Sequence, residues 1–276
     1  MNQTEFVVKD AKKVFRKKGA CSHTLFYLLN REFGQNNAIH ERAADPLAGG
    51  ILQQGYQCGM LWGATMAVGA ESFRRHEDLG QAITTAITTT QNVMQSYTDR
   101  TNAIDCADVT ACDFNSKLSM AKFMLTGKFL SCFTLVENWA PEAMQVAYDG
   151  LSSDEAVKHP ESISCASEVA RKMGATDEEI ATVAGFAGGL GLSGHACGAL
   201  AAAIWLKTVA LCQETPGKVA MFNDEAKKTQ DEFFNLTDYK ILCSDISERQ
   251  FNSAAEHTEF IHNGGCSDLI NHLAAA

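Results

Sequence analysis

The sequence predicts an all-α protein of two similar helical repeats that pack together as a pseudo-two-fold dimer. Apolar residues recur at helical spacing along most of the 276 residues, and long alternating patterns typical of strands are absent. A glycine-rich segment at residues 48–59 occurs again at residues 187–198, an offset of 139 residues without a gap. Between the copies, residues 149–154 form no low-complexity linker, so we expect domains 1–150 and 151–276 to contact each other as two subunits would.

The first repeat begins with two predicted helices that end at glycines. Apolar residues at helical spacing predict a helix over residues 7–15, and Gly19 can terminate it. The next helix is predicted over residues 24–33, with Gly34 at its end. Threonine fills five of the seven positions from residue 84 to residue 90. This run is unusual in a helix, because β-branched side chains lose rotamer freedom there, and we predict no function for it.

The second repeat carries clearer helix signals. A helix is predicted over residues 165–173, and Gly174 follows it. Thr176 precedes three acidic residues and predicts the start of another helix, because a hydroxyl caps free N–H groups and acids favour the first turn. Residues 198–211 form a strongly apolar helical segment, and residues 224–234 form an amphipathic one.

Composition argues against several classes of function. The net charge is −10 and no basic stripe appears, so nucleic acid is not an expected partner. The first nineteen residues lack the apolar region of a secretory signal. The longest apolar run, residues 197–206, is too short to span a bilayer and is followed by Lys207. We therefore expect a cytoplasmic protein without a membrane span.

Each copy carries four cysteines in the same order. Residues 104–109 match residues 241–246 at an offset of 137, and the outer cysteines match at offsets of 144 and 134. Drifting offsets indicate different loop lengths, which surface loops tolerate. Two further cysteines, Cys112 and Cys212, have no counterpart. The matched sets are Cys21, Cys58, Cys106 and Cys132 in the first repeat and Cys165, Cys197, Cys243 and Cys266 in the second.

These cysteines indicate sulfur chemistry. In a reducing compartment structural disulfides are not expected, so metal binding, cluster binding and catalysis compete with simple burial of a small side chain. In each repeat one cysteine stands near a helix start and a second follows a glycine-rich turn that opens a helix, and such a position should lower the thiol pKa. Four thiolates complete a tetrahedral zinc site or hold an iron–sulfur cluster. No C-x-x-C occurs, which argues against a thioredoxin-like motif and an ordinary zinc ribbon.

The order of these residues resembles that of the C-GCAxxG-C-C family of redox-active proteins. The repeats depart from the family pattern at Met60, which replaces alanine, and at Ala202, which replaces the last glycine, but neither change removes a cysteine. Family members are usually a single unit of roughly half this length, so the chain looks like two fused copies. In the second repeat the pattern reads Cys165, then Gly194-His195-Ala196-Cys197-Gly198-Ala199, then Cys243 and Cys266.

The resemblance implies redox activity through the four cysteines of each repeat, with an iron–sulfur cluster as cofactor. A related module in split-Soret cytochromes is associated with a four-cysteine iron–sulfur site, whereas the absence of C-x-x-C-H argues against covalent c-type haem. We expect one cluster per repeat, [2Fe–2S] rather than [4Fe–4S], held by the matched cysteines and used for electron transfer with an unidentified redox partner protein. The alternatives are a metal-free thiol–disulfide redox enzyme or sensor and a zinc-binding helical module.

Overall fold

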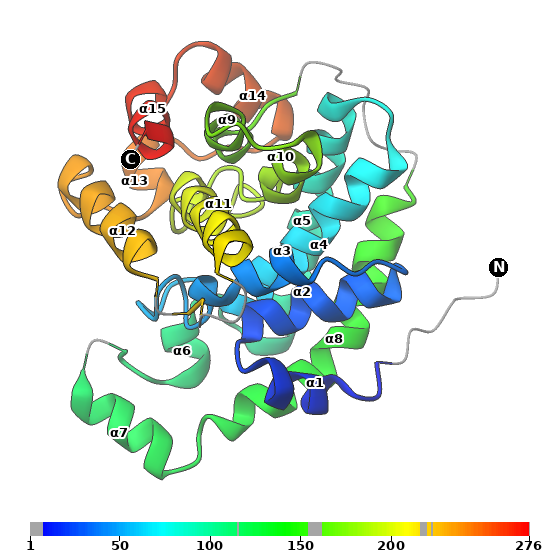
Figure 1. Ribbon diagram of the computed structural model, residues 1–276, viewed down its shortest axis with the longest axis vertical. Coiled ribbons are helices and arrows are strands. Elements are labelled where there is room, and N and C mark those ends of the chain that lie inside the picture. Colours follow the sequence, from blue (N-terminus) through cyan, green and yellow to red (C-terminus); the bar gives the residue numbers. More distant parts are fainter. Residues whose placement is uncertain (1–7, 115, 154–161, 216–219, 222, 276) are drawn as a thin grey trace.

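The computed structural model describes residues 8–275, apart from 115, 154–161, 216–219 and 222. Over these residues the chain forms fifteen α-helices and one short 3-10 helix, with no strand (Figure 1), which confirms the all-α prediction. The first repeat contains α1 (Ala11–Lys18), α2 (Cys21–Glu32), α3 (Ala38–Ala43), η1 (Asp45–Leu47), α4 (Gly59–Arg75), α5 (Leu79–Thr101), α6 (Cys106–Thr110), α7 (Lys117–Leu125) and α8 (Leu130–Leu151).

The second repeat follows the order of the first. The helices α4 and α11 have the same length, and both their first and their last residues are separated by the 139 positions predicted from sequence. The helices of the second repeat are α9 (Cys165–Lys172), α10 (Asp177–Ala184), α11 (Gly198–Glu214), α12 (Asp224–Leu236), α13 (Cys243–Ser247), α14 (Ala254–His262) and α15 (Ser267–Ala275).

The two repeats pack through equivalent surfaces. Helix α10 packs on α4, and its counterpart α3 packs on α11, so each repeat offers the other the same pair of elements. A hydrogen bond of 3.1 Å joins His40 Nε2 to Glu179 Oε1, and these residues are 139 positions apart, so they occupy the same place in the two repeats. Equivalent positions of two repeats can contact each other only near the two-fold axis that relates the repeats. The predicted pseudo-two-fold packing is therefore confirmed.

Helix ends occur at the predicted signals. Gly19 ends α1 in the left-handed conformation, with φ of 83°, and donates its N–H to the carbonyl of Phe15. At the start of α10, Thr176 accepts a hydrogen bond from the N–H of Glu179, and the Glu179 carboxylate accepts one in return from the N–H of Thr176. These local bonds satisfy polar groups that a helix end otherwise leaves free.

The threonine run lies inside α5, and its hydroxyls explain how it fits a helix. Thr84 Oγ1 lies 3.1 Å from the carbonyl oxygen of Gly80, and Thr90 Oγ1 lies 2.7 Å from that of Ala86. Each hydroxyl thus donates to the carbonyl one turn earlier, which leaves its methyl group free to pack. Among the described residues, no helix is long and apolar enough to cross a membrane.

Acid should destabilise the fold through His257 on α14. The side chain is 1% exposed, packs edge-on against Phe251 at 4.9 Å, and leaves Nδ1 without a hydrogen-bond partner. Burial lowers the pKa of His257 from 6.5 to about 4. The unfolded chain therefore takes up a proton below pH 6.5 that the folded chain refuses until about pH 4, and stability falls as pH decreases through this window.

Between pH 7 and pH 5, proton uptake at His257 should lower the free energy of unfolding by about 2 kcal/mol. We expect His257→Leu to abolish this decrease. Urea denaturation at the two pH values measures this difference. His272→Leu, which changes an exposed histidine on α15, serves as the control and should keep the pH dependence of the wild type. Equal pH dependence in both variants would show that His257 titrates as in the unfolded chain.

Candidate functional site

The four matched cysteines of the first repeat converge on one cavity. Cys58 lies close enough to Cys21 to raise the pKa of its thiol, and Cys106 lies close enough to Cys58 to do the same. Cys132 lies close enough to Cys21 for electrostatic interaction between the two sulfurs. All four line the same cavity of about 300 Å³. We call Cys21, Cys58, Cys106 and Cys132 with this cavity the first site.

The second set converges in the same way. Cys197 interacts electrostatically with Cys165, Cys243 and Cys266, so its sulfur lies near all three. Cys165 also interacts with Cys243 and with Cys266. We call these four residues the second site. The structure thus brings together both sets that sequence alignment of the repeats selected.

Backbone hydrogen bonds hold the middle two cysteines of each set together. The N–H of Cys58 donates to the carbonyl of Ile104 at 2.8 Å, and the N–H of Cys106 donates to the carbonyl of Tyr56 at 2.6 Å. Each bond reaches from one cysteine to the residue two positions before the other, which fixes the two segments side by side. The second repeat forms the same pair, from Cys197 to Ile241 at 2.9 Å and from Cys243 to His195 at 2.6 Å.

Glycines let the segment before the second cysteine fold back on itself. Gly50 has φ of 77°, and a Cβ there would lie 2.3 Å from the backbone of Tyr56. Just after the cysteine, a Cβ on Gly59 would lie 2.6 Å from the sulfur of Cys21. Neither position accepts a side chain without displacing its neighbour. The glycine directly after Cys58 therefore places the first turn of α4 against a sulfur atom of the site.

All eight matched cysteines stand at helix N-termini. The sequence predicted this for four of them, and the other four begin helices that sequence patterns did not locate. A helix N-terminus carries free N–H groups and a partial positive charge, so each site faces four such ends and suits a negatively charged sulfur group. Cys21, Cys106, Cys165 and Cys243 are first residues of α2, α6, α9 and α13, Cys58 and Cys197 cap α4 and α11, Cys132 lies in the first turn of α8, and Cys266 directly precedes α15.

The thiol pKa values shift in the direction opposite to our prediction. Burial raises the pKa of Cys132, Cys243 and Cys266 to about 12 in each case. For Cys165, hydrogen bonds from the backbone lower the pKa, but burial outweighs them and the pKa is raised. The lowered thiol pKa values predicted for Cys21, Cys58, Cys165 and Cys197 are therefore wrong, because a neighbouring thiol at Cys21 and Cys58, and burial at Cys165 and Cys197, raise the pKa instead. Without a ligand these thiols keep their protons at neutral pH.

Each site has four cysteine thiols and no disulfide. All ten cysteines are free thiols. Within the described part of the chain, no group of three or more His, Cys, Asp or Glu side chains is arranged to hold a single metal ion. A single zinc ion needs four sulfurs at about 2.3 Å from one point. A cluster, whose metal ions are themselves separated, takes more widely spaced ligands.

Tyr97 on α5 is a site residue that sequence patterns did not identify. Its side chain is fully buried, its hydroxyl has no nitrogen or oxygen partner, and the Cys58 thiol lies beside it. Burial, followed by the nearby cysteines, raises the pKa of Tyr97, so the hydroxyl remains a hydrogen-bond donor. The equivalent position in the second repeat is Leu236, so only the first site has this donor.

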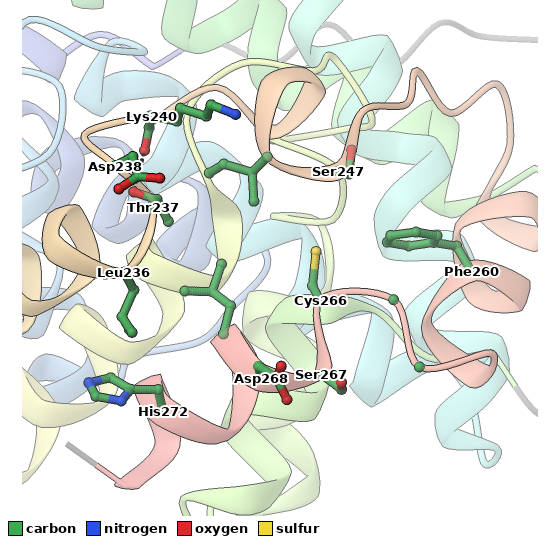
Figure 2. A pocket seen from close by; sticks show the side chains of 14 residues that line it. Leu236, Thr237, Asp238, Lys240, Ser247, Phe260, Cys266, Ser267, Asp268 and His272 are labelled. Atoms are coloured by element: carbon green, nitrogen blue, oxygen red, sulfur yellow. Dashed lines mark hydrogen bonds between the residues drawn. The ribbon is translucent and has the colours of Figure 1, made fainter.

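The two sites differ in their surroundings. The cavity of the first site is lined mainly by apolar side chains, among them Phe15, Met60 and Phe133. The second site borders a larger pocket of about 690 Å³ with polar residues such as Lys240. Figure 2 shows the Cys266 sulfur pointing into this pocket. The second site is thus more open to polar molecules than the first.

The two unmatched cysteines lie outside both sets. Cys212 is near the end of α11, where its sulfur accepts a hydrogen bond of 3.3 Å from Arg42 Nε. Cys112 follows α6 and contacts the sulfur of Met120 at 3.7 Å. Neither interacts with the eight matched cysteines in the way that these interact with one another.

Comparison with known proteins agrees with this division. The family model described as "Putative redox-active protein (C_GCAxxG_C_C)" matches residues 20–146 and again residues 162–276. Each match contains the four cysteines of one site. Comparisons with curated proteins and with solved structures give no match. The chain therefore belongs to the C_GCAxxG_C_C family of redox-active proteins and carries two copies of the family unit in tandem.

Proposed function

We propose that this redox protein transfers electrons and holds one iron–sulfur cluster in each repeat. The observation that carries the proposal is the convergence of four cysteines, each at a helix N-terminus, in both repeats. Bound clusters exchange single electrons. The ligands are Cys21, Cys58, Cys106 and Cys132 in the first site and Cys165, Cys197, Cys243 and Cys266 in the second.

The donor set fits an iron–sulfur cluster. Such clusters are held by four cysteine thiolates, and among the described residues no histidine or carboxylate lines the cavity of the first site. The backbone N–H groups of Gly49 and Ser22 donate to Cys21, and those of Gly188 and Ala166 donate to Cys165. Bonds of this kind to cluster sulfur raise the reduction potential.

Burial of the cysteines would protect a bound cluster and would make its assembly depend on pH. Cys58, Cys106, Cys165, Cys197 and Cys243 are buried, so their ligand sulfurs are shielded from water and oxidants. Because burial raises the pKa of thiols such as Cys132, Cys165 and Cys243 and keeps them protonated, cluster assembly must release protons, and affinity should rise with pH. A reducing compartment such as the cytoplasm suits ten free thiols.

Iron and acid-labile sulfide analysis of protein purified without oxygen tests the proposal. We expect about four of each per chain if both sites hold [2Fe–2S], and about eight of each for [4Fe–4S]. Zinc without iron would support the zinc-binding module. Absence of both metals, together with disulfides that form reversibly between cysteines of one set, would support the thiol–disulfide alternative.

Tyr97→Phe should lower the reduction potential of the first site and leave that of the second unchanged. The hydroxyl next to Cys58 can donate to a ligand sulfur, and loss of such a donor makes the cluster harder to reduce. A redox titration followed by electron paramagnetic resonance measures both potentials. Iron content should stay the same, because no ligand is lost. Equal potentials in Tyr97→Phe and the wild type would show that the hydroxyl does not reach the cluster.

A further inference from the structure

Helix α7 lies over the first site and is left without a packing partner on its outer face. None of its residues is buried, whereas the counterpart helix α14 buries three. Leu118 is 81% exposed and Leu125 is 87% exposed, and these residues share a face of α7 because they are seven positions apart. In Figure 1, α7 lies at the edge of the molecule, away from the helices of the second repeat.

Three exposed lysines lie on or next to this helix. Lys117, Lys122 and Lys128 are exposed, and no carboxylate lies within ion-pair distance of them among the described residues. Residues 114–136 contain these three lysines and no acidic residue. The whole chain has a net charge of −10, so this is a basic surface on an acidic protein.

Helix α1 extends the basic surface around the same cavity. Phe15 of α1 lines the cavity together with Met120 and Phe123 of α7. Arg16 lies 5.8 Å from the ring centre of Phe133, which also lines the cavity, and Lys17 next to it is exposed. On the α8 side, the carboxylate of Glu137 pairs with Lys12 at 2.7 Å. Positive charge therefore borders the first site from two helices.

The corresponding surface of the second repeat has the opposite sign. Residues 251–273, which correspond to residues 114–136 at the offset of 137, contain three acidic residues and no lysine or arginine, a net charge of −3. Asp238 and Asp268 line the pocket beside Cys266. The two sites thus present different charges to solvent, although their cysteines are arranged alike.

We propose that the face formed by Leu118 and Leu125 with the lysines 117, 122 and 128, here called the α7 face, docks an acidic electron-transfer protein. Identification of the docked protein as an electron carrier rests on the proposed function. In the complex one electron passes from the reduced partner to the oxidised first site, the partner is oxidised by one electron, and no bond forms or breaks.

The composition of the α7 face fits a transient protein complex. Electron-transfer encounters use small interfaces, and interfaces in general have an apolar centre and a polar rim. Two exposed leucines with exposed lysines on and next to the same helix have this composition. Membrane binding scales with apolar area, and a nine-residue helix of which Met120 and Phe123 line the cavity offers little of it. Opposite charges also speed association, which a short-lived complex requires.

Reversal of the lysine charges tests the proposal. The variant carries Lys117→Glu, Lys122→Glu and Lys128→Glu, and the probe is a soluble acidic [2Fe–2S] ferredoxin. We expect the affinity and the second-order rate of electron transfer at low salt to fall about ten-fold or more, with a weaker salt dependence than in the wild type. The variant should fold normally, because these side chains are exposed and unpaired; circular dichroism checks this.

A matched control has the same change in charge. Arg171→Glu, Lys172→Glu and Lys228→Glu alter three exposed basic residues of the second repeat and should leave affinity and rate within two-fold of the wild type. Leu118→Ser with Leu125→Ser should weaken binding at all salt concentrations. Calorimetric titration of cluster-free protein with the ferredoxin measures docking without electron transfer. A protein that binds no cluster would therefore contradict the proposed function, while this titration would still test docking on the α7 face.

Three outcomes would overturn the docking proposal. The first is ferredoxin binding that is equal in the lysine variant, its control and the wild type. The second is binding of anionic phospholipid vesicles, lost in the lysine variant, with no binding of ferredoxin. The third is concentration-dependent self-association that the lysine variant abolishes, which would assign the α7 face to a second copy of this chain.

Discussion

Cys58→Ala and Cys197→Ala should each remove the iron and sulfide of one repeat and leave the other repeat loaded. A four-ligand site that loses one thiolate loses most of its metal affinity. The backbone N–H of either residue still donates to the segment that carries the third cysteine, so the fold around the site should persist. Iron and sulfide per chain should fall to about half in each single variant and to near zero in the double variant.

Cys112→Ala and Cys212→Ala are the controls for this result. Both are buried cysteines, so they match the test residues in chemistry and burial, but each occurs in one repeat only. A ligand set that works in one repeat without a given cysteine should not need it in the other. We expect wild-type iron, sulfide and redox potentials in both controls. Full loss of iron from Cys112→Ala, or full retention in Cys197→Ala, would show that the matched sets are not the ligands.

Duplication explains why much of the fold could be predicted from one sequence. Two aligned copies act as a comparison within the chain, and the offset of 139 residues aligned the glycine-rich segments that lead into α4 and α11. The same alignment separated eight cysteines from Cys112 and Cys212. Gly19 and Thr176 marked helix ends because their signals are local, involving only a few neighbouring residues.

Properties that depend on packing could not be predicted in this way. The raised pKa of Cys243 comes from burial, which requires knowledge of every element around it. Tyr97 is far from Cys58 in sequence, and nothing in its neighbours indicates that its hydroxyl faces a sulfur. The exposed α7 and the packed α14 occupy the same place in the two repeats, and their difference lies in contacts with the rest of the fold.

The glycine that follows the second cysteine should be essential for the stability of its repeat. A Cβ on Gly198 would lie 1.8 Å from the carbonyl oxygen of Phe186, a backbone atom that cannot rotate away. Phe186 itself packs against Trp62 of the other repeat at 4.8 Å, so displacement of its backbone would disturb the interface between repeats. We expect Gly198→Ala to lower the free energy of unfolding by about 3 kcal/mol or more, as severe overpacking does.

Urea denaturation of Gly198→Ala, compared with Gly174→Ala, measures this effect. Gly174 ends a helix of the same repeat with φ of 77°, and no atom lies within 4 Å of an added Cβ. Its replacement should therefore cost only the backbone strain of a left-handed alanine, about 1 kcal/mol. Iron in the second site should be lost from Gly198→Ala and kept in Gly174→Ala. If the two variants are equally stable and equally loaded with iron, the contact between Gly198 and Phe186 does not position Cys197.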